Sequence, residues 1–71
     1  MERIPVSSTN IASVGYDKNS NLLEIEFLKN GRVYRYEGVP EYVYNDFMGS
    51  SSLGKYFNQY IKNVYPSYEV T

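Results

Sequence analysis

Apolar and polar residues alternate along three segments in the first half of the chain: Ile11–Asp17, 22–28 and 32–37. Alternation with a period of two is typical of β-strands that bury one face. Asn30-Gly31 is a strong signal for a two-residue hairpin turn, and the polar run 18–21 indicates a second turn. These signals predict a three-stranded antiparallel meander over residues 11–37.

The two turns also predict the register of the strands. The turn at Asn30-Gly31 predicts the pairs Lys29 with Arg32, Phe27 with Tyr34, Glu26 with Arg35, Ile25 with Tyr36 and Glu24 with Glu37. The turn at 18–21 predicts the pairs Asp17 with Leu22, Tyr16 with Leu23, Val14 with Ile25 and Ala12 with Phe27. Both registers place the same residues on one apolar face: Ala12, Val14, Tyr16, Leu23, Ile25, Phe27, Tyr34 and Tyr36. The other face is polar, with Leu22, Leu28 and Val33 as its apolar exceptions.

The second half of the chain changes to helical spacing. Val39, Val43 and Phe47 recur four apart, Pro40 suits a first helical turn and Gly49 suits a helix end, which predicts a helix over 40–48. A second helix is predicted over 53–63 by apolar residues at helical spacing, with N-cap candidates at 50–52: Leu53, Phe57, Tyr60, Ile61 and Val64.

The predicted fold class is therefore α+β. Two C-terminal helices, within residues 40–63, pack on the apolar face of the meander. Residues 1–10 form an extended arm and residues 64–71 a tail. Seventy-one residues allow one domain, 1–71, and no second one.

Composition excludes several classes of chemistry. The chain has no cysteine and no histidine, so it has no disulfide, no zinc site of the thiolate or imidazole type, and no Ser-His-Asp or Cys-His system of its own. Glu24 and Glu26 are paired carboxylates, but on an open sheet face rather than in a cleft. We expect no catalytic residues, no metal and no cofactor, and therefore no enzyme.

Charge and hydropathy limit the partners and the location. The formal net charge is −1, whereas a dedicated nucleic-acid binder is usually strongly basic. No apolar run approaches 18 residues, and the first residues lack the features of a signal peptide. We expect no membrane association and a cytoplasmic location.

Nine tyrosines and three phenylalanines suit either a core or a base-stacking surface. The register favours the core, because it places Tyr34 and Tyr36 on the same face as Ile25 and Phe27. Large rings let a short chain fill a core from few positions.

The start of the predicted second helix is the main candidate site. A small-residue loop that enters a helix presents backbone N–H groups suited to an anion, and a lysine adds charge. The candidate ligand-binding residues are Ser51, Ser52, Gly54, Lys55 and Asn58, and the polar stripe continues through Gln59 and Lys62. The spacing is not that of a Walker loop. An ordinary serine cap with a solvated lysine explains the same residues, and Gly54 indicates either close packing or a ligand.

Two further surfaces are candidates for binding. Lys29 and Arg32 flank the Asn30-Gly31 turn and form a secondary basic patch that can contact phosphate. The apolar exceptions on the polar face, or a free sheet edge, suit a protein partner instead.

The ordered residues resemble the KTSC domain, a small domain named for its occurrence at the C-terminus of some lysyl-tRNA synthetases. The resemblance covers roughly residues 3–66. It is carried by Val6-Ser7-Ser8, Ile11, Val14-Gly15-Tyr16-Asp17, Leu23-x-Ile25-x-Phe27, Tyr34-x-Tyr36, Val39-Pro40, Ser52-x-Gly54-Lys55-Tyr56-Phe57-Asn58 and Ile61.

The resemblance implies a small α+β domain of the stand-alone bacterial or phage form, with no established activity and no catalytic residues to carry over. It also implies a suggested role in RNA binding. We therefore expect a non-catalytic binding module that contacts RNA, such as tRNA, or a ribonucleoprotein through the start of the second helix. The alternative is a protein–protein interaction module that uses a sheet edge or the apolar patch.

Overall fold

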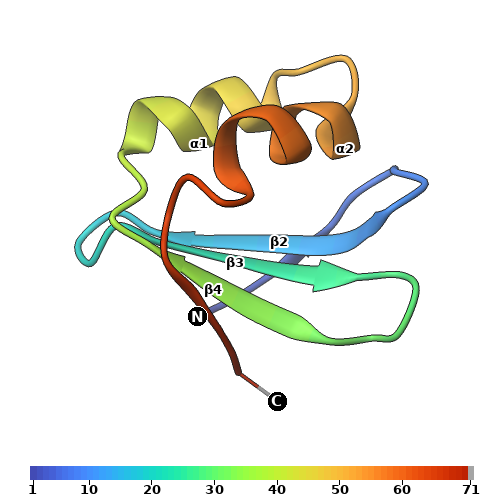
Figure 1. The fold of residues 1–71 in the computed structure, drawn as a ribbon, viewed down its shortest axis with the longest axis horizontal. Coiled ribbons are helices and arrows are strands. Elements are labelled where there is room, and N and C mark those ends of the chain that lie inside the picture. Colours follow the sequence, from blue (N-terminus) through green and yellow to red (C-terminus); the bar gives the residue numbers. More distant parts are fainter. Residues whose placement is uncertain (71) are drawn as a thin grey trace.

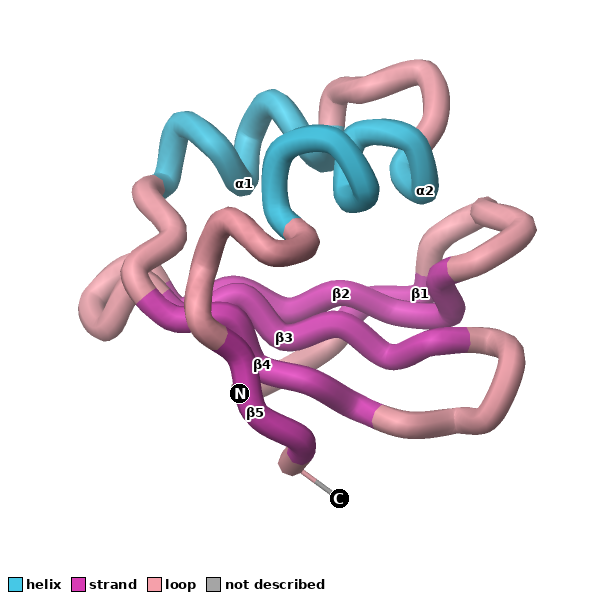
Figure 2. The backbone as a smooth tube through the Cα atoms, viewed as in Figure 1, coloured by secondary structure: helices cyan, strands magenta, loops and turns pink. Residues whose placement is uncertain are grey.

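The computed structural model describes residues 1–70; Thr71, the last residue of the predicted tail, lies outside the described residues. Within residues 1–70 the strands form one five-stranded antiparallel sheet in the order β1-β2-β3-β4-β5. The strands are β1 (Ile4–Pro5), β2 (Ile11–Asp17), β3 (Leu22–Phe27), β4 (Val33–Glu37) and β5 (Ser67–Glu69). Helix α1 (Glu41–Met48), helix α2 (Leu53–Tyr56) and the π-helical segment η1 (Phe57–Ile61) lie together on one face of the sheet (Figures 1 and 2).

The predicted α+β class is confirmed, but the prediction of a three-stranded sheet is wrong. The expected arm contributes β1, in which Ile4 pairs with Val14 and Pro5 with Ser13. The expected tail contributes β5, which pairs with β4. Strands of two and three residues are too short for an alternating pattern to reveal them. A proline is tolerated in β1 because this strand lies at the edge of the sheet.

The register between β2 and β3 is confirmed except at its open end. Asp17 pairs with Leu22 and Val14 with Ile25 as predicted, but an irregularity between Ile11 and Ser13 makes Ile11 the partner of Phe27. The predicted pair of Ala12 with Phe27 is therefore wrong. A β-bulge inserts one extra residue into a strand. Here it brings the fully buried Ile11 into the core, where the strict alternation had placed Ala12.

The register between β3 and β4 is shifted by two residues from the prediction. Glu24 pairs with Arg35, and Ile25 pairs with Tyr34. Residues 28–32 form a longer loop rather than a two-residue turn, and its Gly31 has a positive φ of 69°. A shift of two keeps every side chain on its predicted face. It makes the predicted Glu26–Arg35 pair wrong, and Glu37 faces Leu22 instead of Glu24.

The core lies between the helices and the apolar face of the sheet. Tyr36 is 6% exposed, so its predicted core position is confirmed. The ring of Phe57 packs edge-on against Tyr36 and against Phe27, with centroids 5.5 and 5.4 Å apart. The buried core residues are Ile11, Val14, Leu23, Ile25, Tyr36, Val39, Val43, Phe47, Phe57 and Ile61.

The second helix begins at the predicted Leu53, whereas the first begins at Glu41, one residue after the predicted start. α1 follows Pro40, and α2 follows Ser52, whose hydroxyl accepts a hydrogen bond from the N–H of Lys55 at 3.3 Å. The second helix ends at Ile61 rather than at Asn63. Its last turn widens, since the Lys62 N–H reaches the Phe57 carbonyl five residues earlier at 2.8 Å, and Asn63 then takes a positive φ of 63°.

The N-terminal segment crosses the second face of the sheet, opposite the helices (Figure 2). The backbone oxygen of Glu2 would lie 2.7 Å from a Cβ at position 15, so only glycine fits there without displacing the segment. Arg3 reaches the buried Glu24 on this face.

The apolar exceptions of this face do not form one exposed patch. Val33 is 3% exposed, Leu22 is half-buried and Leu28 is 54% exposed. The apolar patch of the protein-interaction alternative is therefore reduced to Leu28.

Candidate functional site

Two hollows, of about 490 and 620 Å³, lie at opposite ends of β2, and they differ in charge. The larger one is at the end where β2 begins. We call it the lysine–asparagine pocket; its lining residues are Thr9, Asn10, Phe27, Leu28, Lys29, Asn30, Phe57, Asn58 and Lys62.

Three separate parts of the chain build the lysine–asparagine pocket. Asn10 immediately precedes β2, Lys29 and Asn30 belong to the loop between β3 and β4, and Asn58 and Lys62 come from η1 and the residue after it. The Asn30 side-chain oxygen accepts the Arg32 N–H at 3.0 Å, which holds the loop in shape.

Aromatic rings form the floor of the pocket. Phe27 and Phe57 pack edge-on with their centroids 5.4 Å apart, and Phe57 is fixed in turn by Tyr36. Phe57 is nearly buried and Phe27 is half-buried, and both line the pocket.

The lining of this pocket suits a ligand with anionic and polar groups. Among the described residues that line it, the charged groups are the ammonium groups of Lys29 and Lys62, and three side-chain amides add donors and acceptors. Lysine ammonium groups bind phosphate oxygens as point charges, and amides bind base edges or sugar hydroxyls.

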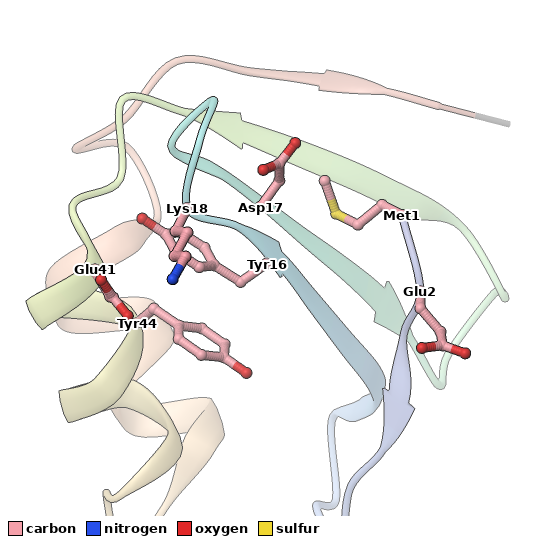
Figure 3. A pocket seen from close by; sticks show the side chains of 7 residues that line it. All are labelled: Met1, Glu2, Tyr16, Asp17, Lys18, Glu41 and Tyr44. Atoms are coloured by element: carbon pink, nitrogen blue, oxygen red, sulfur yellow. The ribbon is translucent and has the colours of Figure 1, made fainter.

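The hollow at the other end of β2 is acidic (Figure 3). Glu2, Asp17 and Glu41 line it beside Lys18. Hydrogen bonds from the Ser20 hydroxyl and the Asn19 N–H lower the pKa of Asp17. Three carboxylates against Lys18 and the N-terminal ammonium group of Met1 leave this hollow with a net negative charge, which is unfavourable for phosphate.

Two stacked tyrosines form a wall of the acidic hollow. The rings of Tyr16 and Tyr44 are nearly parallel, with centroids 4.6 Å apart. The Tyr16 hydroxyl donates to the Val39 carbonyl at 2.6 Å. Burial, followed by the charges of Glu41 and Asp17, raises the pKa of Tyr16, so its hydroxyl keeps its proton and its hydrogen bond.

The structure divides the residues of the predicted helix-start site. Ser51 and Ser52 line a separate hollow of about 410 Å³ with three residues of the arm, Ser7, Ser8 and Thr9. Lys55 is exposed on α2. Asn58 lies instead in the lysine–asparagine pocket, together with Lys29 of the predicted secondary patch.

Gly54 has a packing explanation. A Cβ at this position would lie 2.9 Å from the Asn10 side-chain nitrogen, so the glycine makes room for the residue that precedes β2. Arg32 does not line this pocket; its Nε lies 3.9 Å from the Glu69 carboxylate.

Sequence reasoning missed Asn10 and the part that Phe27 plays in the pocket floor. Periodicity within a segment gives no information about which loops meet in space, and Asn10 reads as an ordinary turn residue. Lys62 was identified only as part of a polar helical stripe.

Within residues 1–70, no helix is long and apolar enough to cross a membrane. In the same part of the chain, no three His, Cys, Asp or Glu residues are grouped so that they could hold a metal ion.

The antiparallel sheet, covered on one face by two short helices, defines a small single-domain α+β protein. The family model of the KTSC domain matches residues 7–65, so the chain belongs to the KTSC domain family, as the resemblance predicted. An uncharacterized protein of Stutzerimonas stutzeri is 42% identical over 62 residues, which cover 87% of this chain and 86% of that protein. A protein of Tsukamurella paurometabola is 34% identical over 58 residues, covering 82% and 85% of the two chains.

A solved structure also shares the whole fold. The crystal structure of a KTSC domain protein from Yersinia pestis superimposes with a TM-score of 0.94 at 40% identity. The match covers 99% of this chain and 97% of the other.

Proposed function

We propose that this KTSC domain is a non-catalytic module that binds single-stranded RNA, such as an unpaired segment of tRNA, at the lysine–asparagine pocket. One observation carries the proposal: Lys29 from a β-hairpin loop and Asn58 and Lys62 from the helical segment line the same hollow. Lys29 is separated from Asn58 by 29 positions and from Lys62 by 33 positions in the sequence.

The chemistry of the pocket supports a flexible nucleic acid rather than a duplex. Unpaired bases can turn their edges toward amide groups and their faces toward aromatic rings, while lysines neutralise the backbone. In this proposal the three asparagines and Phe27 make these contacts beside the two lysines, because all of them line the pocket. The separation of charge along β2 explains how a chain of net charge −1 can offer a local cationic surface.

Lys55 is a further cation on the same helical segment. It is exposed and lies three residues before Asn58 in the sequence. An RNA strand that leaves the pocket toward the start of α2 would pass Lys55 next. In this proposal Ser52 and Gly54 have structural roles, as the N-cap and as the site of contact with Asn10.

An NMR titration of labelled protein with a short oligouridylate tests the proposal. Amides of residues 29, 30, 58 and 62 should shift, and the affinity should fall as salt rises. With two phosphate contacts, the logarithm of the binding constant should change by about −1.4 per decade of salt, at roughly −0.7 per contact for single strands.

Charge reversal provides the matched comparison. Lys29→Glu and Lys62→Glu should each weaken binding about tenfold, which corresponds to about 1.4 kcal/mol. Lys18→Glu makes the same charge change at the acidic end of β2 and should leave binding unchanged. Equal affinity of all three variants, or shifts confined to other surfaces, would overturn the proposal.

A further inference from the structure

A groove lined by tyrosines runs along the two helices, away from the lysine–asparagine pocket. It has a volume of about 830 Å³. Its main walls are Tyr42 and Asp46 of α1, Tyr56 and Tyr60 of the α2–η1 segment, and Val64 and Tyr65 beyond it. Figures 1 and 2 show α1 and the α2–η1 segment side by side on the sheet. We call this feature the tyrosine groove.

Several large side chains that line the tyrosine groove are exposed to solvent. Tyr42 is 69%, Tyr60 50% and Val64 57% exposed. Grouped exposed aromatic residues are typical of protein-binding surfaces, where tyrosine is enriched.

The middle of the groove is preorganised. Tyr56 packs on the buried Phe47 with ring centroids 5.8 Å apart, and Tyr60 packs on Tyr56 at 4.7 Å. Burial, followed by the charge of Asp46 and by the neighbouring tyrosines, raises the pKa of Tyr56, so its hydroxyl remains a donor. A rigid aromatic wall loses little conformational entropy when a ligand binds.

The charge of the groove selects the kind of partner. Among the described residues that line it, Asp46 is the one charged side chain. It would repel a phosphate backbone and attract a basic side chain, so the groove differs in sign from the lysine–asparagine pocket.

The polar rims of the tyrosine rings also select the backbone conformation of the partner. Four tyrosines line the groove, so phenolic hydroxyls accompany its apolar surface. Polyproline II segments dock on aromatic-lined grooves, because proline rings pack on flat rings and the free peptide carbonyls accept hydrogen bonds from hydroxyls.

We propose that the tyrosine groove binds an extended, proline-rich segment of a partner protein that carries an arginine or lysine. The prolines pack between Tyr42 and Tyr60, and the basic side chain pairs with Asp46. This site is independent of the proposed RNA site, because the two surfaces share no lining residue.

Synthetic peptides test the proposal by NMR titration of the full chain. One peptide has six consecutive prolines flanked by arginines, and a second carries glutamates in place of the arginines. We expect shifts at residues 42, 46, 60 and 64 with the arginine peptide, and at least about tenfold weaker binding of the glutamate peptide, equivalent to about 1.4 kcal/mol.

Variants identify the groove as the binding surface. Tyr42→Ser and Tyr60→Ser should each weaken binding at least fivefold, while Asp46→Asn should remove most of the preference for arginine over glutamate. Tyr68→Ser is the matched control, since Tyr68 is an exposed tyrosine on β5, outside the groove. Retained spectral dispersion verifies that each variant is folded.

Three outcomes would overturn the proposal. The first is absence of binding to either peptide at millimolar concentration. The second is unchanged affinity in both tyrosine variants. The third is that the groove amides respond to the oligouridylate, or to dilution of the protein alone, since these results would indicate RNA or a second copy of the chain as the occupant.

Discussion

Arg3 and Glu24 form an ion pair on the second face of the sheet, with the Arg3 Nη1 2.7 Å from the Glu24 Oε2. Arg35 binds the other carboxylate oxygen through its Nε, also at 2.7 Å. The side chain of Glu24 is 3% exposed, so two guanidinium groups cover a buried carboxylate. This arrangement ties the first residues of the chain to the middle of the sheet.

Replacing Glu24 by glutamine should destabilise the fold by about 2 kcal/mol. Removal of one partner from a fully buried ion pair costs about 3–5 kcal/mol, and the one-third exposure of both arginines reduces that figure. Chemical denaturation at pH 7 measures the change. Glu37→Gln, at an exposed position on β4, should change stability by less than about 0.5 kcal/mol.

The same carboxylate predicts a dependence of stability on pH. Burial raises the pKa of Glu24, but the hydrogen bonds and charges of Arg35 and Arg3 outweigh it, and the net pKa lies below the ordinary value of 4.5. A lowered pKa in the folded state stabilises the fold above the ordinary pKa, and this stability is lost as the pH falls through the folded value. Wild-type protein should therefore lose more stability below pH 4.5 than Glu24→Gln does. Parallel acid profiles of the two proteins would contradict this assignment.

Gly15→Ala should destabilise the protein by about 1–3 kcal/mol, the usual cost of overpacking. The new Cβ would meet the backbone oxygen of Glu2 at 2.7 Å, and a backbone atom cannot move aside as a side chain can. A chain shortened by residues 1–3 supplies the test, because the substitution should be nearly neutral in that background. The four proteins to compare by thermal unfolding are wild type, Gly15→Ala, the shortened chain, and the shortened chain with Gly15→Ala. The comparison separates the clash from any other effect of the substitution. An equal loss in both backgrounds would show that the clash with the N-terminal segment is not the cause.

Much of the central sheet could be predicted from the sequence, because alternation fixes which face a side chain occupies. The face of Tyr34 and Tyr36 was predicted correctly even though their partners were not, since the true register differs by two residues. The loop that contains Asn30-Gly31 is longer than the two-residue turn its sequence favours. The edge strands β1 and β5 carry too few residues to show a period.

The candidate site could be predicted only in pieces. Lys29 and Asn58 were named for different surfaces, and tertiary folding places them in one pocket. Gly54 was open to two explanations, and the close approach of Asn10 supports the structural one. No local sequence pattern predicts that Lys29 and Asn58 share a pocket or that Asn10 approaches Gly54, since both depend on how the helices pack on the sheet.

Tyr36 should remain un-ionised well above the pH at which exposed tyrosines lose their protons. Burial, followed by the neighbouring Tyr34, raises its pKa from 10.0 to about 12. A raised pKa stabilises the folded state below pH 10, and this stability is lost as the pH rises from 10 to 12. Two pKa units correspond to about 3 kcal/mol.

Tyr36→Phe removes the ionisable group while keeping the ring. The variant should lose about 2–3 kcal/mol less stability than wild type between pH 10 and 12. Tyr42→Phe, at a position 69% exposed, should follow the wild-type profile. Denaturant unfolding at several alkaline pH values measures both. If Tyr36→Phe unfolds in alkali as wild type does, the burial of this hydroxyl is not what limits alkaline stability.

Tyr36→Ala tests the ring itself. Its removal from the core should cost about 3–5 kcal/mol, as for other large buried aromatic side chains.

Gly54→Ala should have a small effect in the wild-type chain and a larger stabilising effect when Asn10 is also changed to alanine. Alanine is favoured over glycine within a helix by about 1 kcal/mol, but in the wild-type chain the new Cβ must displace the Asn10 amide from 2.9 Å. In the Asn10→Ala background that obstacle is gone, so the gain should approach the full helical preference. A double-mutant cycle measured by thermal unfolding gives the coupling between the two positions. A coupling of zero would show that Asn10 does not explain the glycine. Both variants can also be titrated with RNA. Unchanged RNA binding by Gly54→Ala would confirm that position 54 serves packing. Lost RNA binding with unchanged stability would show that position 54 belongs to the ligand site.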